Sequence, residues 1–181
     1  TEPPIRITGC TIGFIGFGHI PRRIVEKLRG FNTFFLAYDP FLDDDTFSAY
    51  GVQSVSLDEL LVESDFVSVH CPLTEETFHL LDAPRLALMK KSAVLLNTSR
   101  GAVIDEEALI EALREGRLAG AGLDVVENPS KVAENPLLGF HNVVITPHMA
   151  GYSLNHLDLF WRYSVETVID VANGFWPRSC V

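Results

Sequence analysis

Residues 10–30 read CTIGFIGFGHIPRRIVEKLRG, and this stretch decides the fold class. Its first seven residues are almost continuously apolar, as expected of a strand that is buried on both faces of a parallel sheet. Gly16 and Gly18 follow the apolar run, and Ile24 and Leu28 then recur at helical spacing. The stretch therefore predicts a strand, a tight glycine turn and a helix whose N-terminal amides can receive an anion.

The glycine turn departs from the dinucleotide-binding pattern GxGxxG at its third position, where the chain has Pro21. The first two glycines allow the tight turn and the close approach of a pyrophosphate, whereas the third governs packing of the helix on the strand. Proline is tolerated in a first helical turn because its missing N–H would lack an intrahelical partner there. We therefore expect a phosphate site, and the alternative is a glycine-rich bend that holds no ligand. The expected contacts are Gly16, Gly18, His19 and Ile20.

Short apolar runs alternate with helix-like segments along the rest of the chain. The runs are 10–16, 33–38, 66–70, 93–97, 118–124 and 142–146. A capping box at Ser56 and acidic residues after Asp105 mark two helix starts between them. This alternation predicts one domain over residues 1–181, an α/β doubly wound (Rossmann) parallel sheet of about six or seven strands with helices on both faces.

The last predicted helix carries an apolar stripe that we interpret as core packing. Its members are Leu157, Phe160, Trp161, Val165, Val168 and Ala172.

Composition and charge exclude several classes of protein. Charged residues make up 21% of the chain and the net charge is −10, with no cluster of Lys or Arg, which argues against nucleic acid and anionic membrane surfaces as partners. No apolar run approaches the ~20 residues of a membrane span. The three cysteines are far apart, so we expect no disulfide framework and no metal site, and a cytoplasmic location. Because the chain opens with Thr1 rather than Met, we expect a fragment or a processed product.

Asp39 ends the second predicted strand, in the sequence FFLAYDP. An acidic residue about 20 positions after the glycine turn accepts hydrogen bonds from ribose hydroxyls. Pro40 and Phe41 follow, and neither can receive a 2′-phosphate as an Arg does. The pattern favours NAD over NADP, and the alternative for Asp39 is a turn-forming residue before a proline.

Three more stretches extend this pattern through the second half of the chain. They are VSVHCPLTEETFHLLD, LMKKSAVLLNTSRGAVIDEEALIEALREGRLAGAGLDV and NPLLGFHNVVITPHMAG. Together with the glycine turn, and in this order, they resemble the coenzyme-binding domain of the D-isomer-specific 2-hydroxyacid dehydrogenases, over residues 7–176. The resemblance implies an oxidoreductase that transfers hydride between NAD(H) and a small 2-hydroxy or 2-keto acid.

The resemblance assigns roles to polar residues at the ends of predicted strands. Arg100 matches the family's substrate clamp, and a guanidinium can bind a carboxylate and a carbonyl bidentately. His148 matches the general acid/base, a role that imidazole fills near neutral pH. Asp124 matches the residue that contacts the nicotinamide carboxamide. The remaining cofactor contacts are expected at Cys71, Pro72, Thr98, Ser99, Ala150 and Gly151, together with Arg100 and His148.

The chain departs from the family pattern after Asp124. In the family a Glu stands five residues after this Asp, just before a Pro, and hydrogen-bonds the catalytic His. Here the fifth residue is Pro129 itself, so Asn128 takes the Glu position unless Glu127 supplies the carboxylate from a displaced site. Because a carboxylate stabilises imidazolium, we expect an enzyme with Asn128 in this role to lose keto-acid reduction at a lower pH than one with Glu.

Family members are roughly twice as long as this chain, because the coenzyme domain is inserted in a substrate domain. We expect that flanking substrate domain to be absent here, so that the chain binds NAD but turns over poorly without closure over the substrate. The family also implies a homodimer. The alternative function is a non-catalytic NAD-sensing interaction module, similar to corepressors of related fold. The particular 2-hydroxy acid is not predicted.

Overall fold

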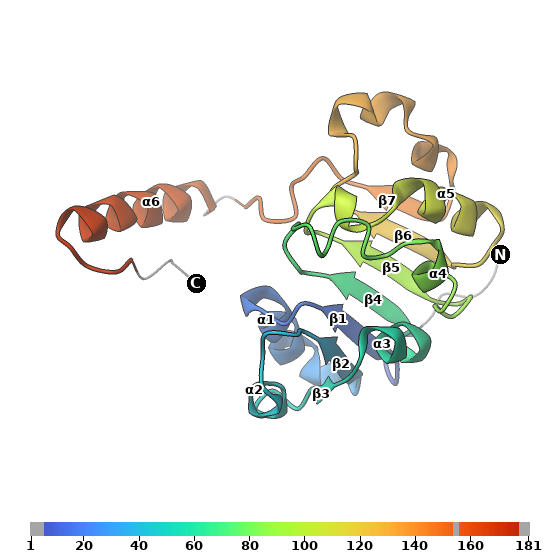
Figure 1. Ribbon diagram of the computed structural model, residues 1–181, viewed down its shortest axis with the longest axis horizontal. Helices are drawn as coiled ribbons and strands as arrows, with labels where there is room; N and C mark the ends of the chain where they lie inside the picture. Colours follow the sequence, from blue (N-terminus) through green and yellow to red (C-terminus); the bar gives the residue numbers. More distant parts are fainter. Residues whose placement is uncertain (1–5, 154–155, 178–181) are drawn as a thin grey trace. The chain divides into compact units, whose positions relative to one another are not determined.

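The computed structural model describes residues 6–153 and 156–177 of the chain. The chain forms two compact units, Thr1–Pro147 and His148–Val181. The first unit contains the seven-stranded sheet, and the described residues of the second contain one helix, α6 (His156–Ala172) (Figure 1). None of the helices in the described ranges is long and apolar enough to cross a membrane.

The sheet has seven strands in the order β3-β2-β1-β4-β5-β6-β7, and every pairing is parallel. The strands are β1 (Thr11–Ile15), β2 (Phe34–Tyr38), β3 (Gln53–Ser54), β4 (Phe66–Val69), β5 (Val94–Asn97), β6 (Gly120–Leu123) and β7 (Val143–Ile145). The order reverses between β1 and β4, and open α/β sheets bind ligands beyond the strand ends at such a switch point. The predicted doubly wound sheet is confirmed, and β3 is the strand that was too short to predict.

The helices of the first unit begin at side-chain caps or at the glycine turn. They are α1 (His19–Leu28), α2 (Asp44–Ser48), α3 (Leu57–Glu63), α4 (Ala83–Leu86) and α5 (Glu106–Arg114), with 3-10 turns η1 (Arg29–Phe31), η2 (Gly101–Val103), η3 (Pro129–Glu134) and η4 (Pro136–Gly139). Asp43, Ser56, Asp82 and Asp105 each accept a hydrogen bond from the backbone N–H three residues on. These caps satisfy amides that have no intrahelical partner.

The core consists of two clusters that lie on opposite faces of the sheet. Successive residues of a strand point to opposite faces, and Phe14 of β1 belongs to one cluster while Ile15 belongs to the other. The first cluster includes Val25 of α1 and Phe47 of α2. The second takes its helical members from α3, α4 and α5, such as Leu60, and reaches across β4, β5 and β6. Helices therefore cover both faces, as predicted.

The apolar stripe lies on α6, in the second unit, and its interpretation as core packing stays a prediction. Phe160 is 52% exposed, Trp161 64%, Val165 55% and Val168 68%. The side chain of Leu157 lies outside the described residues. Helical spacing identifies an apolar face, but it does not show which surface covers that face.

Candidate functional site

The glycine turn between β1 and α1 is shaped by two glycines with different roles. Gly16 has φ +87°, and a Cβ atom placed there would lie 2.8 Å from the backbone N of Cys71. Only glycine fits this conformation and this close approach. Gly18 caps α1, and a Cβ atom placed on it would meet nothing within 4 Å. The turn is thus packed against the segment after β4 and open in front of α1.

The open side of the turn presents the N-terminus of α1. Its first two residues, His19 and Ile20, are exposed, and the first turn has no acidic side chain. Pro21 is buried and has no backbone N–H. The backbone amides that precede Pro21 are still available to hold a ligand at this helix end. Arg22 Nε donates to the carbonyl oxygen of Phe17, in the glycine turn, at 3.0 Å. A helix end of this kind attracts an anion such as a phosphate.

Asp39 lies directly after β2 and reaches the glycine turn. Its Oδ2 accepts a hydrogen bond from the backbone N–H of Phe17 at 2.9 Å, and its Oδ1 accepts one from that of Phe41 at 3.1 Å. An ionised carboxylate has further acceptor capacity, so both oxygens can still accept bonds from ribose hydroxyls. Within the described ranges no Lys or Arg side chain forms an ion pair with Asp39.

Two cavities flank the segment that follows β4. The larger, of about 600 Å³, is lined by Gly16, Gly18 and Asp39 among others. The smaller, of about 550 Å³, is lined by Ile20, Leu73, Thr98, Ser99 and Arg100. Both also include His70, Cys71 and Pro72 in their walls, so they adjoin along this segment. Pro21 lines neither of them. The arrangement suits an elongated ligand with phosphates at α1 and a ribose at Asp39.

The shared wall of the cavities is electrically neutral near pH 7. Burial lowers the pKa of His70 to about 4, and its Nε2 lies 2.9 Å from the hydroxyl of Ser68. Burial also raises the pKa of the Cys71 thiol to about 11. The thiolate is the reactive form of cysteine, so Cys71 acts here as a small apolar residue and not as a nucleophile.

Arg100 lies on a turn after β5 that is held by side chains. Asn97 Nδ2 donates to the carbonyl oxygen of Arg100 at 2.9 Å, and Asn97 Oδ1 accepts from the N–H of Ser99 at 2.9 Å. The Ser99 hydroxyl donates to the carbonyl oxygen of Cys71. Arg100 itself is exposed, and no carboxylate in the described part of the chain forms an ion pair with it. Its guanidinium is therefore available to an anionic ligand.

Asp124 lies at the neighbouring strand end, directly after β6. It is buried, its N–H donates to the carbonyl oxygen of Asn97 at 2.9 Å, and its carboxylate accepts a hydrogen bond from the Thr146 hydroxyl. Asn97 thus links the turn of Arg100 to Asp124. The structure brings both residues to the same edge of the sheet, beyond adjacent parallel strands.

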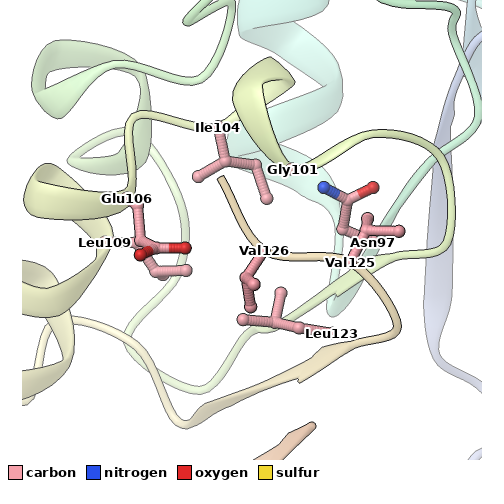
Figure 2. Close-up of a pocket in the computed structure, with 8 residues that line it drawn as sticks. All are labelled: Asn97, Gly101, Ile104, Glu106, Leu109, Leu123, Val125 and Val126. Carbon is pink, nitrogen blue, oxygen red and sulfur yellow. The ribbon is translucent and has the colours of Figure 1, made fainter. Parts of the chain in front are cut away.

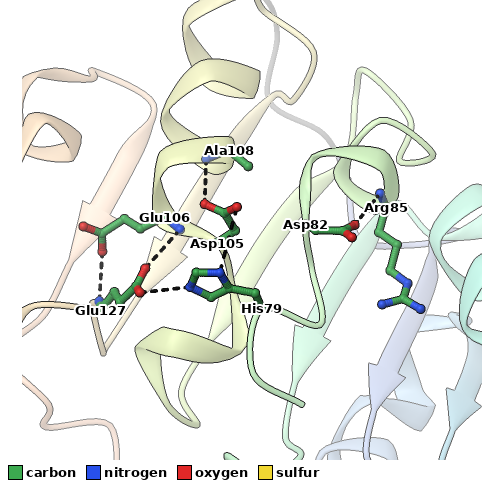
Figure 3. Close-up of polar contacts among 7 residues, drawn as sticks. All are labelled: His79, Asp82, Arg85, Asp105, Glu106, Ala108 and Glu127. Atoms are coloured by element: carbon green, nitrogen blue, oxygen red, sulfur yellow. Dashed lines mark hydrogen bonds and ion pairs between the residues drawn. The ribbon is translucent and has the colours of Figure 1, made fainter. Parts of the chain in front are cut away.

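Glu127 and Asn128 follow Asp124 and differ in their surroundings. Glu127 Oε1 accepts a hydrogen bond from His79 Nε2 at 2.9 Å, and its Oε2 lies 3.4 Å from the backbone N of Glu106 (Figure 3). Asn128 is exposed at the start of η3 and makes no capping hydrogen bond with its side chain. The carboxylate of Glu127 is therefore engaged within the first unit.

His148, Ala150 and Gly151 belong to the second unit, and all three are exposed. His148 has φ +52°, in the left-handed region, and the N–H of Tyr152 donates to the carbonyl oxygen of Met149 at 2.9 Å in the turn that follows. The predicted catalytic and cofactor-binding roles of these three residues stay predictions.

The cavity walls contain residues that the sequence analysis did not single out as ligand contacts. They are Ile15, Tyr38, Pro40, Phe41, Thr74, Glu76, Thr77 and Leu80 in the larger cavity, Leu73 in the smaller one, and His70 in both. Their signal in the sequence was position, since Ile15 and Tyr38 end β1 and β2 and the others lie in the two segments that directly follow β2 and β4. The parallel pairing of β2 and β4 on either side of β1 brings these segments together, and sequence spacing does not show it.

A doubly wound parallel sheet, a glycine turn before α1, an acid after β2 and a cavity across the switch point define a dinucleotide-binding α/β domain. Residues 2–150 match the model of the family described as D-isomer specific 2-hydroxyacid dehydrogenase, NAD binding domain. The chain belongs to this family, which confirms the resemblance found in the sequence, and NAD is the cofactor of the domain.

Known relatives agree with this assignment. A glyoxylate reductase of Korarchaeum cryptofilum is 46% identical over 175 residues, which cover 97% of this chain and 53% of the relative. An NAD-complexed D-isomer specific 2-hydroxyacid dehydrogenase of Lactobacillus delbrueckii ssp. bulgaricus is 34% identical, with a TM-score of 0.88 over 100% of this chain and 59% of its own. A D-lactate dehydrogenase with NAD+ from Lactobacillus jensenii is 31% identical, with a TM-score of 0.87 and the same coverage. The chain spans about half the length of the relatives that it matches.

Proposed function

We propose that residues 1–181 form the NAD-binding domain of an oxidoreductase that transfers hydride between NAD(H) and a small 2-hydroxy or 2-keto acid. One observation carries the proposal. Two adjoining cavities share His70, Cys71 and Pro72, with the glycine turn and Asp39 on one side and Arg100 on the other. A cofactor that extends along this path has its phosphates at α1 and its reactive end toward the guanidinium of Arg100, which forms no ion pair with any carboxylate of the described residues. The enzymes among the relatives favour this function over a non-catalytic NAD-sensing module.

In this proposal, each residue of the site has one role in binding the cofactor, binding the substrate or transferring a proton. Amides at the start of α1 bind the pyrophosphate, and Asp39 accepts hydrogen bonds from a ribose. Bound NADH supplies the hydride for C2 of the keto acid. Arg100 binds the substrate carboxylate and holds the carbonyl group. His148 donates a proton to the carbonyl oxygen, which becomes the hydroxyl of the product, and takes that proton back in the reverse direction.

Asp124 and Glu127 have supporting roles in this proposal. Asp124 accepts a hydrogen bond from the nicotinamide carboxamide. The carboxylate of Glu127 is already bonded to His79, which supports Asn128 as the residue in the usual position of the family's Glu. An Asn there provides His148 with a neutral partner.

A binding experiment on this chain and an activity assay test the proposal separately. NADH titrated into the 181-residue chain should bind, and Asp39→Ala should weaken binding by about tenfold, as expected from the loss of hydrogen bonds to a charged group. Failure of the wild-type chain to bind NADH at millimolar concentration would overturn the assignment of the cofactor site.

The activity assay uses the longer protein that contains this chain. NADH oxidation should depend on a 2-keto acid, and glyoxylate is the first to test because a relative is a glyoxylate reductase. Pyruvate, the keto form of lactate, is the second. Arg100→Ala should abolish turnover while NADH binding persists, and Arg100→Lys should restore little of it because an ammonium is not a bidentate donor. Turnover by Arg100→Ala at the wild-type rate contradicts the assigned role.

We also propose that the protein is a cytoplasmic homodimer. Cys10 and Cys71 are both free thiols, which suits a reducing compartment. The exposed apolar side chains of α6, such as Phe160 and Trp161, suit a face that another subunit covers. Light scattering coupled to size-exclusion chromatography should give twice the mass of one chain, and the mass of a single chain at micromolar concentration excludes the dimer.

A further inference from the structure

His79, in the segment after β4, makes a polar contact with the segment after β6. Its Nε2 lies 2.9 Å from Glu127 Oε1, and its Nδ1 lies 4.0 Å from Asp105 Oδ2 (Figure 3). A carboxylate only accepts hydrogen bonds, so Nε2 carries the hydrogen and donates it to Glu127. The side chains are 31% and 23% exposed. A charge-assisted hydrogen bond in this half-buried place is stronger than one on the open surface.

The backbone of His79 is held as firmly as its side chain. Its N–H donates to the carbonyl oxygen of Ala102 at 2.8 Å, in the turn that carries Arg100. Its φ is +49°, a left-handed conformation that residues other than glycine rarely adopt. Such strain persists where the surrounding contacts determine the conformation. The ring of Phe78 also stacks on the imidazole, with the ring centroids 3.9 Å apart.

The turn of Arg100 and the segment after Asp124 touch through their backbones. A Cβ atom on Gly101 would lie 2.1 Å from the carbonyl carbon of Val126 and 2.5 Å from the N of Glu127. A cavity of about 10 Å³, close to the space for one water molecule, lies at this contact (Figure 2). The turn of Arg100 and the segment after Asp124 are therefore in direct backbone contact at Gly101.

Glu127 is also anchored to α5. Its N–H donates to Glu106 Oε2 at 2.9 Å, and Asn135 Nδ2 donates to Glu106 Oε1 at 2.8 Å. The carboxylate of Glu127 faces the N-terminus of α5, where a negative charge is favourable. The helix therefore gives Glu127 a fixed position, and His79 is bonded to that fixed carboxylate and to the turn of Arg100 at once.

We propose that His79 is a positioning residue that holds the turn of Arg100 against the segment after Asp124, through its bonds to Glu127 and Ala102. The functional part of this inference rests on the proposed function, in which Arg100 and Asp124 bind substrate and cofactor. A displacement of about 1 Å in such a group can reduce the rate of a reaction by on the order of a hundredfold.

Hydrogen exchange in the 181-residue chain tests the local part of the proposal without any activity. In His79→Ala, backbone amides at 98–103 and 125–127 should exchange about tenfold faster, the factor expected for one lost charge-assisted hydrogen bond. His79→Gln keeps an N–H donor of similar reach and should restore protection. His141→Ala, which removes an exposed histidine before β7, is the control and should change neither segment. Unchanged exchange in His79→Ala overturns the proposal, and so does an equal increase in β4, which would mean general destabilisation.

Kinetics of the longer protein test the functional part. His79→Ala should lower kcat/KM for the keto acid by 10- to 100-fold while the Kd for NADH changes less than threefold, and His79→Gln should recover most of the loss. Glu127→Ala should have the same effect, and the double variant should be no worse than either one. Wild-type kcat/KM in His79→Ala overturns the proposal. If the wild-type protein reduces no 2-keto acid, the proposed function fails, and hydrogen exchange still decides whether His79 holds the turn.

Discussion

The half-buried imidazole of His70 should make the stability of this chain depend on pH, and substitution of His70 should remove that dependence. Burial lowers its pKa from 6.5 to about 4 in the folded chain, whereas the unfolded chain keeps the higher value. Below pH 6.5 the unfolded chain therefore takes up a proton that the folded chain does not. The stabilisation associated with neutral His70 is complete above pH 6.5 and is lost as the pH falls toward 4.

The size of this loss follows from the two pKa values. The free energy of unfolding should fall by about 2 kcal/mol between pH 7.5 and pH 5, and by about 3 kcal/mol by pH 4, through His70 alone. His70→Gln removes the titrating group and keeps a polar atom that can reach Ser68, so its stability should depend on pH less steeply by these amounts. Other titrating groups are common to both proteins and cancel in the difference.

Urea unfolding at pH 7.5 and at pH 5, followed by circular dichroism, measures the effect. With an m-value of about 2 kcal/mol per M, the midpoint of the wild type should fall by about 1 M more than that of His70→Gln. Equal shifts of the two midpoints would mean that the imidazole is protonated in the folded chain. The assumed burial of His70 between the cavities and Phe14 would then be wrong.

Three more predictions concern the same unit. Gly16→Ala should weaken NADH binding by at least tenfold and destabilise the fold by about 1–3 kcal/mol, because the new Cβ meets the backbone of Cys71. Calorimetry that gives the wild-type affinity for NADH in this variant would contradict the prediction. Burial disfavours the charge of Asp65, but hydrogen bonds from Thr11 and Lys90 outweigh it and lower its pKa, so Asp65→Asn should cost about 1 kcal/mol at pH 7. That difference, seen in urea midpoints, should shrink as the pH falls below 3.8, and a constant difference speaks against the ion pair. Cys71 should react with iodoacetamide at pH 8 at least tenfold more slowly in the folded chain than in urea, because burial raises the pKa of its thiol to about 11. Mass spectrometry measures both rates, and equal rates would refute the prediction.

The local sequence predicted the fold because short-range physics determines most of it. The apolar run before Gly16 forms β1, the glycine turn starts α1, and Ser56 caps α3. The parallel order of the strands follows from their alternation with helices. β3 has only two residues, so it shows no apolar pattern from which a strand could be predicted. Its pairing with β2 is seen only in the structure.

The sequence could predict only those residues of the candidate site that lie at the end of a predicted strand. Asp39 and Asp124 directly follow a strand and Arg100 lies three residues after one, so the sequence places all three at the carboxyl edge of the sheet. The position of the family's Glu was different, because the sequence left open whether Asn128 or Glu127 takes it. A hydrogen bond to His79, 48 residues away along the chain, depends on which loops meet and could not be read from spacing.

By itself the sequence determined the class of fold, the glycine turn before α1, the family and the cofactor, since these depend on residue types at fixed local spacing. Only the tertiary structure decided that His70, Cys71 and Pro72 form a wall common to two cavities, and that His79 bonds to Glu127. The physical reason is that burial, pKa shifts and loop-to-loop hydrogen bonds arise from neighbours that are distant in sequence. The pairing of parallel strands brings those neighbours together, and no single stretch of sequence contains them.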